Sequence, residues 1–299
     1  MSTFTSQAGI SAFGTTSHSY LEFDLTEQGL ENQEEAIDLA LDAVAASMQT
    51  GTAVMTVIGF RPEFWASSDY PAIQKLEGFN RPVVGLDGFS MPATQHDLVL
   101  WIHGGAMDAV FNAGADLTQA ISQYFKLENA DSGWVYQHNR DLTGFVDGTE
   151  NPSPLEIPEV IQDETTGGSV LLLQKWPHEG DKWLALSTEE QEAVIGRTKD
   201  TDVELEDRPV SSHVARNDQE DLGDILRRNT AFGDVATHGT MFVGIAAKRE
   251  TMQVMLDRMA GKDGVRDALT FFSHADTGAY YYLPPQNILL DHLPEEEED

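Results

Sequence analysis

The stretch DLVLWIHGGAMDAVFNAGADLTQAISQYF, Asp97–Phe125, joins a strand to a helix and indicates the fold class. Residues 97–103 are rich in large apolar residues, which is typical of a strand. Apolar residues then recur at helical spacing over residues 107–125. On one side of this helix lie Val110, Leu117, Ile121 and Tyr124. The stretch therefore predicts an α+β protein in which amphipathic helices cover a sheet.

The same two kinds of element recur on both sides of this stretch. Further helices are expected at residues 32–49, 187–199 and 250–259. Further strands are expected at residues 18–25, 52–60, 169–175, 241–246 and 279–283. Asn32 with Glu35 and Ser187 with Glu190 resemble helix-capping pairs, and Gly261 is placed to end the last helix.

Each half of the chain reads as strand, helix, strand, strand, helix, strand, which is the ferredoxin-like order. We therefore predict two ferredoxin-like domains, residues 1–130 and 131–299, that meet around Asn129–Gly133. Residues 148–168 and 200–240 lack periodicity. Long irregular segments of this kind are usually functional or disordered, so both are candidates for the functional site.

Composition excludes several classes of protein. Lys and Arg number 18 against 50 Asp and Glu, for a net charge of −32, and such a surface repels nucleic acid and anionic membranes. The absence of cysteine excludes disulfides, iron–sulfur clusters, thiolate ligands and covalently attached c-type haem. Histidine is left as the protein ligand for a borderline metal.

Targeting signals are not evident in the sequence. No run approaches the ~18 apolar residues that a membrane helix needs, and residues 1–17 do not have the pattern of a signal peptide. A cytoplasmic protein is therefore expected. The acidic end, residues 295–299, is expected to be a solvated tail.

The first chemical motif is GFVDGTENP, residues 144–152. Gly144 and Gly148 permit tight backbone geometry on either side of Asp147, so the carboxylate can be held rigidly toward a ligand. The alternative is an ordinary turn rich in Asp and Gly.

The second motif surrounds His213 in residues 208–218, and Arg227, Arg228 and Asn229 follow soon after it. No HExxH or comparable pair of histidines supports a zinc site. A single histidine ligand suits haem, whose porphyrin supplies the other equatorial bonds. The alternative is a surface or core histidine without a ligand role.

Four segments in order resemble one known family. GFVDGTENP (144–152), IGRTK (195–199), SSHVARND (211–218) and ILRRNTAFG (225–233) are similar to the signature segments of B-type dye-decolourising peroxidases. TGAYYYLPP (277–285) resembles the closing strand of that family. The resemblance implies two ferredoxin-like halves of the dimeric α+β barrel type, with haem b held mostly by the second half.

The resemblance also implies roles for individual residues. His213 corresponds to the axial iron ligand, and Asp147, Arg227 and Asn229 correspond to the catalytic groups on the opposite face. Relatives often carry an acidic residue where this chain has Arg228, so either neighbouring arginine could face the iron. Arg227 is preferred because it fits the ILR-x-N frame.

Other cofactor contacts follow from the same resemblance. Arg197 is expected to pair with a haem propionate, because a guanidinium suits a carboxylate, although it could also be a surface charge. Gly148 and Thr149 are expected beside the haem. The family usually supplies an acidic partner for the axial histidine, and Asp267 and Asp276 are both candidates.

The implied activity is that of a haem peroxidase, which uses hydrogen peroxide to oxidise dyes, phenols and other small electron donors through an oxyferryl intermediate. Asp147 would act as base and then as acid, and Arg227 would stabilise negative charge. An aspartate base, ordinarily with a pKa near ~3.9, predicts an acidic optimum.

Other functions remain open at this point. The main alternative is a haem-handling protein, either a carrier or one that releases iron from haem. A non-haem ferredoxin-like binding module is a further possibility. The family suggests a homo-oligomer, and the acidic C-terminus does not resemble the tag of an encapsulin cargo protein.

Overall fold

One antiparallel sheet runs through the residues that this computed structural model describes, 5–49 and 53–294. Its strands in the first half are β1 (Ser17–Leu25), β2 (Val54–Phe60), β5 (Leu98–Gly104) and β6 (Phe125–Trp134). Those in the second half are β7 (Ser169–Pro177), β8 (Leu226–Arg227), β9 (Thr230–Gly233), β10 (His238–Ala246) and β11 (Ala279–Leu283). The strand order is β7-β11-β2-β5-β1-β6-β9-β10-β8, and β10 also pairs with β7. The sheet therefore closes into a barrel.

Each half has the strand order of a ferredoxin-like fold. In the first half β6, β1, β5 and β2 are neighbours in that order, which places the fourth strand beside the first, then the third and the second. In the second half the order β11, β7, β10, β9 repeats the pattern, and β8 precedes β9 along the same side of β10. The predicted α+β fold class is confirmed.

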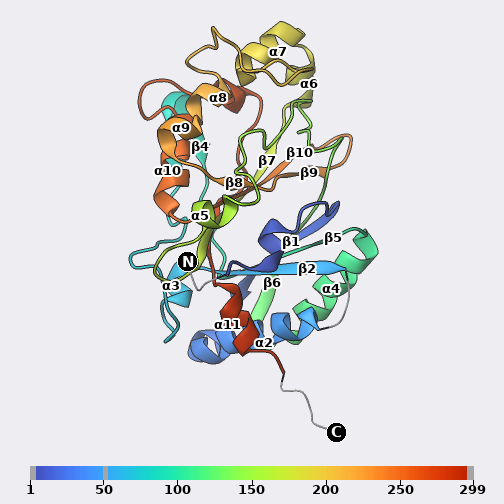
Figure 1. Ribbon diagram of the computed structural model, residues 1–299, viewed down its shortest axis with the longest axis vertical. Coiled ribbons are helices and arrows are strands. Elements are labelled where there is room, and N and C mark those ends of the chain that lie inside the picture. Colours follow the sequence, from blue (N-terminus) through green and yellow to red (C-terminus); the bar gives the residue numbers. More distant parts are fainter. Residues whose placement is uncertain (1–4, 50–52, 295–299) are drawn as a thin grey trace.

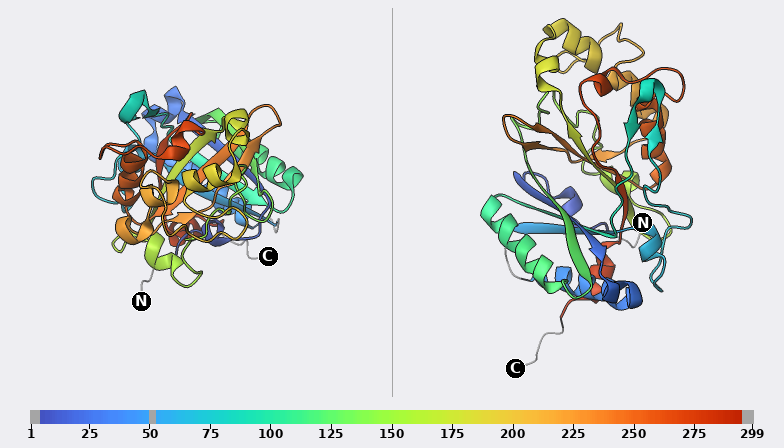
Figure 2. Two further views of the ribbon diagram at one scale, coloured as in Figure 1. Left: turned by 90° about the horizontal axis from the view of Figure 1, so that it is seen from above. Right: turned by 180° about the vertical axis from the view of Figure 1, so that it is seen from behind.

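Helices cover the outer face of the barrel at both ends of the molecule (Figures 1 and 2). In the first half, α2 (Gln33–Met48) and α4 (Met107–Ala120) cover the strands, and Ile37 and Leu41 share one apolar core with Leu100. In the second half, α10 (Arg249–Met259) packs on β10 through a separate core that includes Met252 and Leu256. Both helices of the first half use the apolar stripe expected from their spacing.

Inward-facing residues of the strands form a third core, inside the barrel. Val57 and Trp101 from the first half meet Leu171 and Val243 from the second. Side chains alternate across a strand, so each strand contributes one row to this core and another to the helices. The barrel interior therefore joins the two halves.

Short elements complete the fold. The helices are α1 (Glu27–Glu31), α3 (Pro62–Trp65), α5 (Ile157–Ile161), α6 (Gly180–Leu184), α7 (Thr188–Ile195), α8 (His213–Arg216), α9 (Gln219–Leu222) and α11 (Gln286–Asp291). Three 3-10 helices span Ala8–Ser11, Leu86–Gly88 and Ala268–Phe271, and β3 (Val83–Val84) pairs with β4 (Ser90–Met91). In the described ranges no helix has both the length and the apolar character needed to cross a membrane.

The helix boundaries test the expected caps. Ser187 forms the predicted capping box, and its helix α7 ends at Gly196, which is left-handed with φ +99°. Gly261 follows α10 with φ +77°, as expected of a glycine that ends a helix. The predicted Asn32 cap is wrong, because no amide of helix α2 donates to the Asn32 side chain, which instead donates from Nδ2 to the Gln28 carbonyl.

Three strands of the barrel were missed in the sequence. The expected junction at Asn129–Gly133 lies inside β6, and the segment 200–240, expected to be irregular, contains β8 and β9. Strand β6 is largely polar and exposed, so it lacks the apolar alternation that identifies strands. The start of the strand predicted at Thr52 and the acidic tail 295–299 lie outside the described residues.

Candidate active site

His213 begins helix α8 at the edge of a pocket in the second half. The preceding Ser212 caps the helix by accepting a hydrogen bond from the Ala215 amide. The Nδ1 atom of His213 lies 2.7 Å from Oδ2 of Asp267, and its Nε2 atom has no hydrogen-bond partner in the part of the chain that the structure describes. An imidazole held at Nδ1 presents the Nε2 lone pair to a metal.

Asp267 is the acidic partner of this histidine. It is fully buried, and its Oδ1 atom accepts a hydrogen bond from the Leu269 amide at 2.8 Å. Asn217 donates to both the Asp267 carboxylate and the His213 carbonyl. Asp276, the other candidate in the sequence, is half-exposed and lies beside His274. The structure thus selects Asp267.

The electrostatics of the pair raise the pKa of the imidazole. Burial lowers the pKa of His213, and the neighbouring Asp267 carboxylate raises it by more, so that the pKa lies above its ordinary value. A buried carboxylate that accepts a hydrogen bond from Nδ1 increases the electron density that Nε2 offers to a metal.

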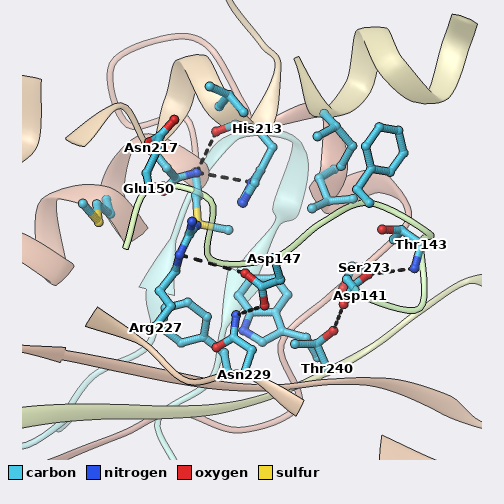
Figure 3. Close-up of a pocket in the computed structure, with 18 of the residues that line it drawn as sticks. Asp141, Thr143, Asp147, Glu150, His213, Asn217, Arg227, Asn229, Thr240 and Ser273 are labelled. Carbon is cyan, nitrogen blue, oxygen red and sulfur yellow. Dashed lines mark hydrogen bonds and ion pairs between the residues drawn. The ribbon is translucent and has the colours of Figure 1, made fainter. Parts of the chain in front are cut away.

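Three polar side chains lie across the pocket from His213 (Figure 3). Asn229 donates from Nδ2 to Oδ2 of Asp147 at 2.7 Å, and the Nε atom of Arg227 is 4.0 Å from Oδ1. Asn229 is itself fixed, because its Oδ1 atom accepts from the Val243 amide at 2.8 Å. The three residues that the sequence assigned to one face are therefore brought together.

The choice between the two neighbouring arginines follows from the strand geometry. Arg227 lines the pocket that His213 faces. Arg228 points the other way and donates to the carbonyls of Ile10 and Ala12, with its guanidinium 5.3 Å from the centre of the Trp101 ring. Consecutive residues of an extended chain point to opposite sides, so only Arg227 faces this pocket.

The loop that carries Asp147 is held on both sides. The Asp147 amide donates to the Asn139 carbonyl at 2.8 Å. Gly148 is left-handed with φ +77°, and a Cβ there would lie 2.8 Å from Nδ2 of Asn151. The side-chain amide of Asn151 fixes the backbone of Arg227, because it accepts from the Arg227 backbone N–H and donates to the Arg227 carbonyl, each at 2.9 Å. Sequence reasoning missed Asn151, although it belongs to the GFVDGTENP motif.

The pocket between the two faces has the character of a haem cavity. It encloses about 1300 Å³ with its mouth included, which is large enough for a cofactor. Its apolar walls include Leu172, Met252 and Met255. Two buried donors that line it, Nε of Arg227 and Nε2 of Gln174, have no hydrogen-bond partner among the described residues. An unpaired buried donor costs ~1–3 kcal/mol, so the site is suited to a ligand with acceptors. The residues present fit haem.

The residues expected beside the haem edge lie at the rim. Arg197 and Thr149 line the pocket, whereas Gly148 lies in the adjoining cavity. The Arg197 guanidinium bonds Glu150 at 2.5 Å and the Asp202 carbonyl at 3.0 Å. The expected pairing of Arg197 with a propionate stays a prediction.

Four further pocket residues were not identified in the sequence. Asp141, His178, Thr240 and Ser273 form a hydrogen-bonded cluster on the pocket wall. No local motif connects them, because Asp141 lies in a loop, His178 follows β7, Thr240 lies in β10 and Ser273 follows the 3-10 helix Ala268–Phe271.

The fold and the site together define a class of protein. A ferredoxin-like barrel places one histidine, paired with a buried carboxylate, across a pocket from an acid and an arginine, which is an arrangement suited to haem-dependent peroxide chemistry.

Comparison with known proteins places the chain within this class. A family model for the C-terminal region of Dyp-type peroxidases matches residues 138–288. A dye-decolorizing peroxidase of Mycobacterium tuberculosis is 37% identical over 230 residues, which cover 71% of this chain and 68% of that protein. The solved dye-decolorizing protein from V. cholerae has a TM-score of 0.85 at 30% identity and covers 96% of this chain and 99% of its own. A DypB variant from Rhodococcus jostii RHA1, solved in complex with heme, has a TM-score of 0.84 at 32% identity, with 95% and 97% covered. The chain belongs to the dye-decolourising peroxidase family.

Proposed function

We propose that this chain is a haem-dependent peroxidase that uses hydrogen peroxide to oxidise dyes, phenols and other small reductants. The observation that carries the proposal is the pairing across one pocket of His213–Asp267 with Asp147, Arg227 and Asn229. Simple haem storage needs no acid–base group on the second face. Haem b as the cofactor, a homo-oligomeric assembly and a cytoplasmic location belong to the same proposal.

The residues on the His213 side of the pocket would hold the cofactor. Bound haem supplies the iron at which peroxide is reduced and electron donors are oxidised. His213 would ligate it through Nε2, and the Asp267 carboxylate keeps the proton on Nδ1 and orients the ring. The apolar walls exclude water from the reacting centre.

The opposite face handles the peroxide proton. Oδ2 of Asp147 is occupied by the amide of Asn229, so Oδ1 is the oxygen left to take a proton from one peroxide oxygen and return it to the other. Arg227 carries a permanent charge 4.0 Å from Oδ1 and stabilises the negative charge that develops as the O–O bond breaks.

Stopped-flow spectroscopy of the haem-loaded protein tests the proposal. Asp147→Ala and Arg227→Leu should each slow the reaction with one equivalent of peroxide by ~10²–10⁴-fold, as expected for loss of a general acid–base or charge-stabilising group. Arg228→Leu is the matched control and should leave the rate per bound haem unchanged.

Two results would count against this assignment. Unchanged peroxide rates in both Asp147→Ala and Arg227→Leu would contradict the assigned roles. Release of free porphyrin without peroxide would indicate iron removal from haem as the function.

A further inference from the structure

A second hydrogen-bonded cluster lies in the haem pocket beside the Asp147 group. Asp141 stands on the same loop as Asp147, where Arg140 and Val146 form an antiparallel bridge, and its Oδ1 atom accepts from the Thr143 amide at 2.8 Å. Figure 3 shows Asp141 and its partner side chains at one end of the pocket. The mechanism described above does not use them.

Each hydrogen in this cluster can be assigned. A carboxylate has no hydrogen, so the Thr240 hydroxyl donates to Oδ2 of Asp141 and accepts, at 3.1 Å, from Nε2 of His178. The Nδ1 atom of His178 lies 3.0 Å from Oγ of Ser273, which is also 3.4 Å from the Pro177 carbonyl. The serine hydroxyl can donate to the ring when Nδ1 is bare, or to the carbonyl when Nδ1 carries a proton.

It follows that His178 can gain or lose its Nδ1 proton while every hydrogen bond is kept. Only the Ser273 hydroxyl has to rotate. Nε2 of His178 is also 3.5 Å from Oδ2 of Asp141, so the ring lies directly beside this carboxylate. Burial raises the pKa of Asp141, and the facing imidazole and the hydroxyl of Thr240 lower it by more, so the pKa lies far below its ordinary range. The carboxylate therefore stays charged.

The neighbouring charges have other partners. Arg140 donates to the carbonyls of Gly144 and Lys199, and Glu179 pairs with Lys182. Other titratable groups on the same loop, strands and segments include Asp147, Glu150, Lys175, Arg227, His238, Asp267, His274 and Asp276. Among the described residues, only Asp141 forms an ion pair with His178.

The cluster also connects two cavities. Asp141 and Thr240 line both the haem pocket and a second cavity of about 860 Å³, whereas His178 and Ser273 line the haem pocket alone. The second cavity also borders Tyr136. Asp141 and Thr240 thus lie between the second cavity and the haem pocket.

Peroxide reduction needs such a proton source. The overall reaction, H2O2 + 2 e⁻ + 2 H⁺ → 2 H2O, consumes two protons along with two electrons from the donor. Asp147 takes a proton from one peroxide oxygen and returns it to the other, so it supplies neither of them. A donor without an ionisable hydrogen cannot supply them either.

We propose that the His178–Asp141 pair stores the proton consumed in each one-electron step and passes it to the haem pocket through Ser273. The Nδ1 atom of the imidazolium gives its proton to the Ser273 hydroxyl, which passes its own hydrogen into the haem pocket as the donor electron arrives, and Nδ1 regains a proton by the reverse route before the next step. The inference rests on the proposed peroxidase function.

The first test measures the ferric–ferrous midpoint potential of the haem-loaded protein against pH. In the wild type the potential should fall as pH rises, by at most 59 mV per unit for one proton per electron. His178→Gln should flatten this slope. His274→Gln is the control: it replaces a half-exposed histidine of a neighbouring segment, and the slope of potential against pH should equal that of the wild type. An unchanged slope in His178→Gln would overturn the proposal.

The second test compares two donors after one equivalent of peroxide. Hydroxymethylferrocene gives an electron and no proton, whereas a phenol gives both. His178→Gln and Ser273→Ala should slow the ferrocene reaction about a hundredfold, the lower range for a general acid, and should change the phenol reaction and the initial peroxide reaction less than ~2-fold.

Ser273→Ala keeps the ion pair, so it tests the relay if His178→Gln fails to bind haem. Equal slowing with both donors, or no slowing in Ser273→Ala, would refute the relay. A wild-type protein that neither binds haem nor reacts with peroxide would instead refute the proposed function.

Discussion

Replacing His18 and His103 together by glutamine is expected to remove much of the acid sensitivity of the fold. Both rings are buried inside the barrel, where Trp101 donates to Nδ1 of His18 at 3.0 Å. His103 lies between the Thr15 hydroxyl and the Gly9 carbonyl, each at 3.0 Å. No carboxylate forms an ion pair with either ring in the described part of the chain.

The magnitude follows from the two pKa values. Burial, assisted by the charge of Arg228, lowers the pKa of His18 to about 4. Burial, assisted by His18 and Arg228, lowers the pKa of His103 to about 3. Below pH 6.5 both rings bind a proton in the unfolded chain but not in the folded chain. The free energy of unfolding therefore decreases as pH falls, until the rings of the folded chain also bind protons. At pH 5 each ring lowers the free energy of unfolding by about 2 kcal/mol. The two rings together lower it by about 4 kcal/mol, whereas a typical protein has a total of about 5–15 kcal/mol.

Urea unfolding of the haem-loaded protein at pH 8 and pH 5 measures this effect. The double glutamine variant loses hydrogen bonds, which lowers its stability at both pH values. Its free energy of unfolding should decrease between pH 8 and pH 5 by about 4 kcal/mol less than that of the wild type. His274→Gln, at a half-exposed position, should behave as the wild type. Equal losses in the wild type and the double variant would refute the reasoning. If the prediction holds, the fold limits activity in acid independently of the catalytic groups.

Three other substitutions test the site itself. Asp267→Asn should weaken haem binding ~10–100-fold and raise the iron midpoint potential, as followed by haem titration and spectroelectrochemistry, because the axial histidine loses its carboxylate. Gly148→Ala should destabilise the fold by ~1–2 kcal/mol in urea, because its left-handed backbone strains an alanine and the new Cβ displaces Asn151. Asn229→Ala should slow the peroxide reaction in stopped-flow by ~10²-fold, because Asp147 loses the amide that positions it; an unchanged rate would show that the amide is dispensable.

The sequence alone was sufficient to predict features that depend on near neighbours. The capping box at Ser187 is local, and it forms as predicted. The α+β class also follows from local periodicity, and it is confirmed. The glycines around Asp147 predicted a constrained loop, and Gly148 does adopt a left-handed backbone there. These features depend on residues a few positions apart, so pattern and propensity are sufficient to find them.

The tertiary structure decided what depends on distant residues. Asp267 could not be chosen over Asp276 in the sequence, because 54 positions separate it from His213 and only the closed barrel brings the two side chains together. Strand β6 was missed because its polar residues gain their partners only when β1 and β9 lie beside them.

The sequence therefore determined the chemistry that the chain carries: one histidine, an acid in a glycine frame and two neighbouring arginines. The tertiary structure decided how that chemistry is arranged. Because consecutive residues of an extended chain point to opposite sides, Arg227 lines the pocket and Arg228 does not. The fold also placed His178 beside Asp141. Sequence patterns report the preferences of neighbouring residues, whereas hydrogen bonds and burial inside a barrel depend on contacts that exist only after the chain has closed.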